Sequence, residues 1–316
     1  MIEVDSLSKR YGDKLAVDSL SFAVRSGVVT GFLGPNGAGK STTMRMIMDL
    51  DHPSAGTVRI NGRPYAQHKA PLHEIGALLE AKAIHPGRSA YDHLRALAAS
   101  NGIDKRRVFE VIDMVGLTEV ARKRAGGFSL GMGQRLGIAS ALLGDPRIVM
   151  LDEPVNGLDP EGVLWIRNLL KSLAAQGRTV FVSSHLMSEM ALIAEDLIVI
   201  GRGRLLSAGP LADFIAQASN SSVRVRSPQA ARLRDLLLGD GVTITGGEPG
   251  LLDVKGLQAA EIGERAAAAG LVLHELALQE ASLEEAFMEL THDSVEYHAT
   301  SEPAGSELAG TGRTNR

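Results

Sequence analysis

The sequence predicts an α/β fold followed by a smaller α+β domain, and three observations support this prediction. Short apolar runs at 28–33, 147–151 and 179–183 have the length of buried strands, and helical patterns separate them along the chain. Strands that alternate with helices form a mostly parallel sheet, which binds ligands at the carboxyl ends of its strands. The composition changes after about Gln217, where a second series of short strands and helices begins.

The composition limits the classes of function. The 316 residues are 44% hydrophobic and 22% charged, as in ordinary globular proteins, and the net charge is −4. Because a basic excess is missing, we expect no nucleic-acid partner. The absence of cysteine excludes disulfides, thiolate metal sites and cysteine nucleophiles. We expect neither a signal peptide nor a membrane span, because no apolar run reaches roughly 18 residues.

The first domain is predicted to cover residues 1–217. Alternating apolar positions indicate strands between residues 2 and 24, at Leu15, Val17, Leu20, Phe22 and Val24. A further strand is expected at 57–60, and a hairpin at 197–200 with 204–208. Helical patterns occupy 41–50, 90–120, 163–175 and 187–194, and the second of these is interrupted by Asn101-Gly102 and Gly116.

The second domain is predicted to cover residues 218–291. Strands are expected at 223–226, 242–244, 251–254 and 271–276, with helices at 230–238 and 261–269 and a final helix at 283–290. The order βαββαβ is that of a split-βαβ, ferredoxin-like domain. Residues 292–316 are rich in Ser, Thr, Gly, Glu and Ala, with almost no large apolar side chain, and are predicted to be a disordered tail.

A glycine-rich segment lies between a predicted buried strand and a predicted helix. It fits the pattern G-x-x-x-x-G-K-[ST] and is followed by Thr42; its members are Gly34, Pro35, Asn36, Gly37, Ala38, Gly39, Lys40 and Ser41. Glycines allow backbone N–H groups to approach phosphate oxygens, and the helix N-terminus favours negative charge. Lys40 is expected to reach the β- and γ-phosphates of ATP, and the Ser41 hydroxyl to bind Mg²⁺. The strand–loop–helix context argues against an incidental glycine turn.

A second motif consists of an apolar strand that ends in two carboxylates, Asp152 and Glu153. An aspartate at such a strand end suits Mg²⁺ coordination, and a glutamate beside the γ-phosphate can orient or deprotonate the attacking water. Alone, the segment could be a solvent-exposed acidic turn. Each motif supports the interpretation of the other, so together they predict a nucleoside triphosphatase of the P-loop class.

A third segment, 128–135, resembles the signature motif of the ABC ATPases in the form S-L-G-M-x-Q-R. The family's other motifs follow in order over residues 1–215, and the resemblance implies a helical subdomain at about 82–145. It implies that Tyr11 stacks on adenine, that His185 contacts the γ-phosphate, and that Asp159 belongs to the D-loop. It also implies an ATP-sandwich dimer with a second copy, in which the signature residues contact ATP of the opposite subunit: Ser129, Leu130, Gly131, Met132 and Gln134.

One position departs from the family pattern, because Glu80 stands where a glutamine that contacts Mg²⁺ is usual. A carboxylate keeps the oxygen ligands and adds a charge. This variant, the signature form and the appended domain resemble bacterial ABC-2-type exporters of drugs and lantibiotics. The resemblance implies an ATPase at the cytoplasmic face of the membrane that drives a separate transmembrane permease. An importer subunit and a soluble, non-transporter ABC ATPase are the alternatives, and the transported substrate stays open.

Overall fold

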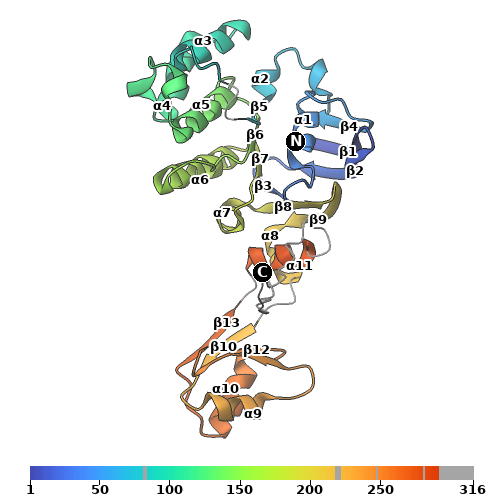
Figure 1. The fold of residues 1–316 in the computed structure, drawn as a ribbon, viewed down its shortest axis with the longest axis vertical. Coiled ribbons are helices and arrows are strands. Elements are labelled where there is room, and N and C mark those ends of the chain that lie inside the picture. The colour runs from blue at the N-terminus through green and yellow to red at the C-terminus, as the bar shows by residue number, and fades with distance from the viewer. Residues whose placement is uncertain (81–83, 218–221, 247, 280–281, 292–316) are drawn as a thin grey trace, which may run out of the picture.

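The computed structural model describes residues 1–80, 84–217, 222–246, 248–279 and 282–291 (Figure 1). The predicted disordered tail, 292–316, lies outside the described residues. Of the described helices, none is both long and apolar enough to cross a bilayer.

A six-stranded sheet forms the centre of the first domain. Its strands, in spatial order, are β5 (Ile75–Leu78), β6 (Ile148–Asp152), β7 (Thr179–Ser183), β3 (Val29–Leu33), β8 (Asp196–Gly201) and β9 (Arg204–Pro210). All neighbours pair in parallel except β8 and β9, which form the predicted antiparallel hairpin. The continuous burial of β3, β7 and β8 explains why apolar residues predominate in their sequences. The strand β5 was not predicted.

A second, antiparallel sheet packs against one face of the central sheet. It consists of β2 (Lys14–Val24), β1 (Ile2–Tyr11) and β4 (Ala55–Ile60), in that order. The ring centroid of Phe22 in this sheet lies 5.9 Å from that of Phe32 and 6.1 Å from that of Phe181 in the central sheet. The helix α1 (Lys40–Ile47) contributes Met44, Met46 and Ile47 to the same core. These contacts fix the start of α1 beside the end of β3.

The other face of the central sheet is covered by helices (Figure 1). They are α5 (Leu130–Leu142), α6 (Pro160–Ala175) and α7 (Met187–Ile193), and α3 (Ala90–Ser100) and α4 (Lys105–Met114) pack on α5 and on each other. The helix–turn–helix of α3 and α4 confirms the interruption that was predicted at Asn101-Gly102. A short helix, α2 (Pro71–Glu74), precedes β5.

The small domain has its own apolar core under a four-stranded antiparallel sheet. The strand order is β11 (Thr243–Thr245), β12 (Leu251–Lys255), β10 (Ser222–Arg226) and β13 (Glu275–Gln279), with α9 (Ala230–Leu237) and α10 (Ala259–Ala268) packed on each other. The predicted βαββαβ order of these elements is confirmed. The last strand was placed wrongly at 271–276, because Leu271 instead closes α10 through its N–H bond to Ala266 O, at 2.9 Å.

The final helix, α11 (Leu283–Thr291), was assigned from sequence to the small domain, but it packs elsewhere. It contacts α7 and α8 (Leu211–Gln217) of the first domain (Figure 1). Its buried side chains Leu283, Ala286 and Phe287 belong to the core of that domain. The spacing i, i+3, i+4 indicates an apolar face on the helix but does not identify the surface that covers it. The chain therefore returns to the first domain after completing the small one.

Candidate functional site

The site lies where three adjacent parallel strands end. Register pairs join Asp152 of β6 to Ser183 of β7, and Ser183 to Phe32 of β3. The glycine-rich loop that follows β3 therefore lies beside both predicted acidic residues, at the edge of the sheet where α/β folds bind ligands. The two motifs, more than 100 residues apart in the sequence, form one site.

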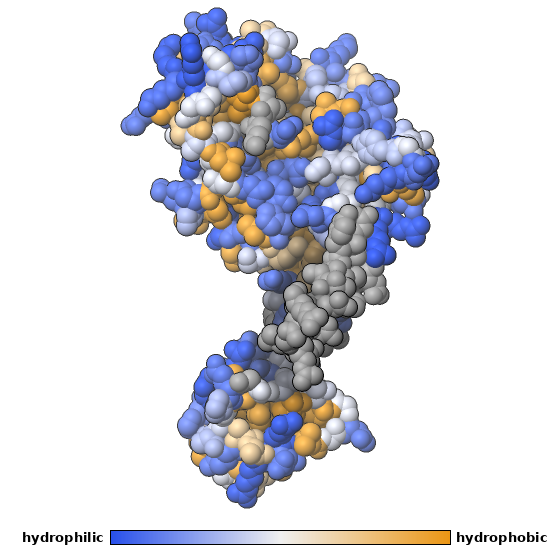
Figure 2. Space-filling view, viewed as in Figure 1, coloured by the Kyte–Doolittle hydropathy of each residue, from blue (hydrophilic) through white to orange (hydrophobic). Residues whose placement is uncertain are grey.

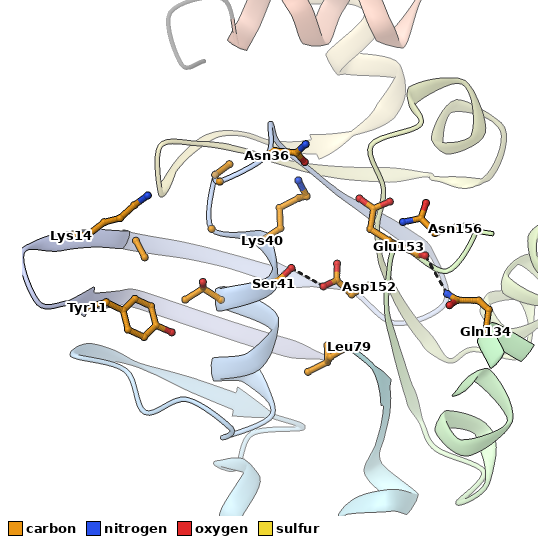
Figure 3. A pocket seen from close by; sticks show the side chains of 15 residues that line it. Tyr11, Lys14, Asn36, Lys40, Ser41, Leu79, Gln134, Asp152, Glu153 and Asn156 are labelled. Atoms are coloured by element: carbon orange, nitrogen blue, oxygen red, sulfur yellow. Dashed lines mark hydrogen bonds between the residues drawn. The ribbon is translucent and has the colours of Figure 1, made fainter. Parts of the chain in front are cut away.

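A cavity of about 590 Å³ opens at this edge (Figure 3). Its walls come from the end of β1, the start of β2, the glycine-rich loop, β5 and the segment after β6; the lining residues are Tyr11, Lys14, Ala16, Asn36, Gly37, Ala38, Gly39, Lys40, Ser41, Thr42, Leu79, Gln134, Asp152, Glu153 and Asn156. In Figure 3, Tyr11 lies on one side, Lys40 lies near the middle, and Glu153, Asn156 and Gln134 lie on the other side. The sequence analysis missed Lys14 and Ser183, because no motif contains them. Asn156 lies in the predicted D-loop, residues 155–159, but was not singled out as a site residue.

The glycine-rich loop and the start of α1 line the cavity. Gly39 has φ of 101°, and a Cβ there would lie 2.7 Å from the Ala16 carbonyl oxygen, so a glycine is required. No side chain caps α1, which starts at Lys40. The Lys40 ammonium, with a residue exposure of 8%, bonds to Gly34 O at 2.5 Å and Pro35 O at 3.3 Å. Burial lowers the pKa of Lys40, while Glu153 and Asp152 oppose that shift.

Two hydroxyl groups hold the Asp152 carboxylate. Ser41 Oγ donates to Asp152 Oδ2 at 2.7 Å, and Ser183 Oγ donates to Asp152 Oδ1. The Ser183 oxygen also accepts the backbone N–H of Glu153 at 2.9 Å. Ser183 is fully buried, so its one hydroxyl fixes both acidic residues relative to β7.

Glu153 is held at its backbone and at its carboxylate. Its φ of 51° is in the left-handed region, which is unusual for a residue with a side chain. Gln134 Nε2 donates to Glu153 O at 3.2 Å, a bond that Figure 3 shows beside the cavity. Glu153 Oε2 lies 2.6 Å from His185 Nδ1, and because an ionised carboxylate only accepts, Nδ1 carries the proton. The predicted catalytic pair is therefore in direct contact.

The signature segment forms the N-terminus of α5. The Ser129 hydroxyl accepts the Met132 N–H at 3.2 Å, and the Leu130 side chain is 57% exposed. A Cβ at Gly157 would lie 2.3 Å from Leu130 Cδ2, and one at Gly131 would lie 3.0 Å from Gly157 O. The signature segment and the D-loop of one chain are therefore in contact.

Gln134 lies between the cavity and the backbone of its own chain. It lines the cavity, its residue exposure is 3%, and its amide is bonded to Glu153 O. Its predicted contact with ATP of an opposite subunit stays a prediction.

Of three other predicted residues, Tyr11 lines the cavity, whereas Asp159 and Glu80 do not. The Tyr11 residue is 48% exposed, and its hydroxyl donates to Asp51 Oδ2 at 3.1 Å. Asp159 caps α6 by accepting the Gly162 N–H at 2.9 Å. Glu80 is exposed after β5, and its neighbour Leu79 lines the cavity in its place. The metal-binding role of Glu80 stays a prediction.

Comparison with known proteins matches this arrangement to a family. A model of the ABC transporter family matches residues 17–156, and a model of a domain of unknown function matches residues 221–284. An uncharacterized ABC transporter ATP-binding protein, YhcH of Bacillus subtilis, is 42% identical over 209 residues, covering 65% of this chain and 68% of that protein. The bacitracin transport ATP-binding protein BcrA of Bacillus licheniformis is 41% identical over 213 residues, covering 66% and 70%.

Solved structures agree with the sequence matches. The dimeric structure of MJ0796, a bacterial ABC transporter cassette, has a TM-score of 0.62 and 26% identity, covering 67% of this chain and 99% of that one. The same cassette in a post-hydrolysis state with ADP and Pi has a TM-score of 0.61 and 25% identity, covering 67% and 99%. This chain belongs to the ATP-binding proteins of ABC transporters, the subunits that bind and hydrolyse ATP.

Proposed function

We propose that this chain powers export, as an ATPase that docks on separate transmembrane subunits at the cytoplasmic face of the membrane. The observation that supports this proposal is that several relatives are named for transport or export. The BcrA proteins are named for bacitracin transport, SrtF of Streptococcus pyogenes for lantibiotic transport, and a Burkholderia orbicola relative for Nod factor export. They are 33–41% identical to this chain and cover 65–75% of it.

The chain is further proposed to work as a dimer with a second copy, with ATP held between the two. Support comes from the dimeric state named for the related cassette. Ser129 and Leu130 are at the exposed N-terminus of α5, where backbone N–H groups suit a phosphate of the partner's nucleotide. Residues 1–217 with α11 form the ATPase unit, and residues 222–279 form the appended domain.

We propose a role for each side of the cavity. Lys40 and the loop N–H groups hold the β- and γ-phosphates, and Tyr11 stacks on adenine at the far end. Glu153 accepts a proton from the attacking water, and His185 keeps that carboxylate directed through its 2.6 Å bond. This bond supports the proposed contact of His185 with the γ-phosphate.

The oxygen groups fit a magnesium ion. Ser41 Oγ and the Asp152 carboxylate lie 2.7 Å apart, and hard oxygen ligands are those that Mg²⁺ prefers. Among the described residues there is no cluster of three His, Asp or Glu side chains that could hold a metal. This agrees with Mg²⁺ chemistry, in which substrate phosphates and water complete the shell. When bound, the ion neutralises charge on the phosphates.

A native-membrane experiment tests the proposal. The tagged chain is purified in mild detergent, and the sensitivity of the host to bacitracin and a lantibiotic is measured with the gene deleted. Export predicts a co-purifying polytopic protein and increased sensitivity, restored by wild type but not by Glu153→Gln. Co-purification with an external solute-binding protein, or dependence of uptake on this chain, would instead indicate an importer.

A further inference from the structure

The residue predicted to stack on adenine is held by a network that no motif contains. Tyr11 is the last residue of β1, and its register partner across the hairpin is Lys14. Its phenol hydroxyl donates to Asp51 Oδ2 at 3.1 Å. Asp51 follows α1, so the bond ties the end of β1 to the helix that starts at Lys40.

A second layer of contacts fixes Asp51. Arg45, on the last turn of α1, donates from Nε to Asp51 Oδ2 at 2.7 Å and from NH2 to Oδ1 at 3.4 Å. Hydrogen bonds from Arg45 lower the pKa of Asp51, so the carboxylate stays ionised at neutral pH. Partial burial and the bond to Asp51 raise the pKa of Tyr11, which keeps the phenol a donor.

A third contact restricts the orientation of the Tyr11 ring. Lys9 Nζ lies 5.0 Å from the centroid of the Tyr11 ring, within the range of a cation–π interaction. The same ammonium donates to His52 O at 2.5 Å, next to Asp51. Lys9 does not line the nucleotide cavity, whereas Tyr11 does. The ammonium therefore supports the ring from outside the cavity.

We propose that Asp51, braced by Arg45, is a positioning residue for the nucleotide base: it sets the Tyr11 ring in the orientation that adenine requires. A ring on a partly exposed strand end has free rotamers, and ordering it on binding weakens affinity. The bond to Asp51 and the contact with Lys9 restrict those rotamers before ATP arrives. The restriction acts on base binding, because the side chains of Lys40 and Ser41, the predicted phosphate and Mg²⁺ contacts, take no part in it. The Thr42 side chain, which also lines the cavity, interacts with the Tyr11 phenol.

The test compares ATP with inorganic triphosphate, which has no base. In the full-length chain, Asp51→Ala and Tyr11→Phe are each expected to raise the KM and Kd for ATP about threefold to tenfold, as the loss of one hydrogen bond does. The kcat for ATP hydrolysis and the inhibition constant Ki of triphosphate should both remain at wild-type values. The double variant should be no worse than either single variant, because both remove the same bond.

A matched control is Asp13→Ala, which removes a carboxylate from the hairpin tip beside Tyr11 but outside the network. It is expected to bind ATP as wild type does. Equal ATP affinity in Asp51→Ala, Tyr11→Phe and wild type would overturn the proposal. Parallel weakening of ATP and triphosphate would also overturn it, since Asp51 would then only stabilise α1. The proposal rests on the ATPase assignment; if the wild type itself fails to bind ATP, that assignment fails instead.

Discussion

Replacing Ser183 with alanine tests whether one buried hydroxyl holds both acidic residues of the site. The change leaves the Glu153 N–H without its acceptor and removes one of the two hydroxyl donors to Asp152. An unsatisfied buried donor costs about 1–3 kcal/mol, and a hydrogen bond to a charged group contributes about 1.5–3 kcal/mol. Because the two losses share one site, we expect the free energy of unfolding to fall by about 2–4 kcal/mol.

The assay uses denaturant unfolding followed by the fluorescence of Trp165, the single tryptophan, together with kcat for ATP. Looser support of Glu153 should lower kcat at least about tenfold, which equals about 1.4 kcal/mol in the barrier. Thr179→Val is the matched control: it removes a buried hydroxyl, bonded to Ser26 at 3.0 Å, at the other end of β7. It should cost about 1 kcal/mol and leave kcat unchanged. Wild-type stability and kcat in Ser183→Ala would refute the reasoning.

Four further predictions concern other parts of the chain. Glu153→Gln should abolish ATP turnover and stabilise an ATP-bound dimer, measured by phosphate release and light scattering; normal hydrolysis would contradict its role. Ser129→Ala should lower kcat more than it weakens ATP binding to the monomer, and equal losses would argue against a contact in trans. Burial lowers the pKa of Lys40 in the folded protein below its value of 10.5 in the unfolded chain. Between these two pKa values the unfolded chain binds more protons than the folded one, so the free energy of unfolding of the nucleotide-free protein should rise with pH. Denaturation measurements on Lys40→Met should no longer show this rise. Phe287→Ala should destabilise the unit reported by Trp165 by about 3–5 kcal/mol, and an unchanged transition would show that α11 does not stabilise it.

The sequence predicted the parts of the fold whose pattern is local. The run 179–183 has three consecutive apolar residues at its centre because the strand is buried on both faces, and this pattern can be recognised without knowledge of the neighbouring strands. The glycine-rich loop was equally predictable, because its φ values and close backbone contacts restrict which residues fit. The position of Lys40 beside Asp152 and Glu153 then follows from the rule for strand ends in parallel sheets.

The misassigned features all depend on contacts between distant segments. The stripe on α11 would fit either domain, and only the groove beside α7 and α8 decides between them. Apolar residues near 271–276 matched a strand, but Leu271 completes the helix cap before the chain extends. A hydrophobic pattern specifies burial, whereas the partner is set by tertiary packing.

Glu153 shows the limit most clearly, because its local conformation contradicts its residue type. Left-handed backbone is usually taken by glycine or asparagine, and a residue with a longer side chain costs about 1–3 kcal/mol there. Bonds from Ser183 to its N–H and from Gln134 to its carbonyl hold it in that state. Both partners come from other elements, α5 and β7, and His185 then directs the carboxylate. The motif therefore locates the catalytic residue, while residues 19 to 32 positions away in the chain aim it.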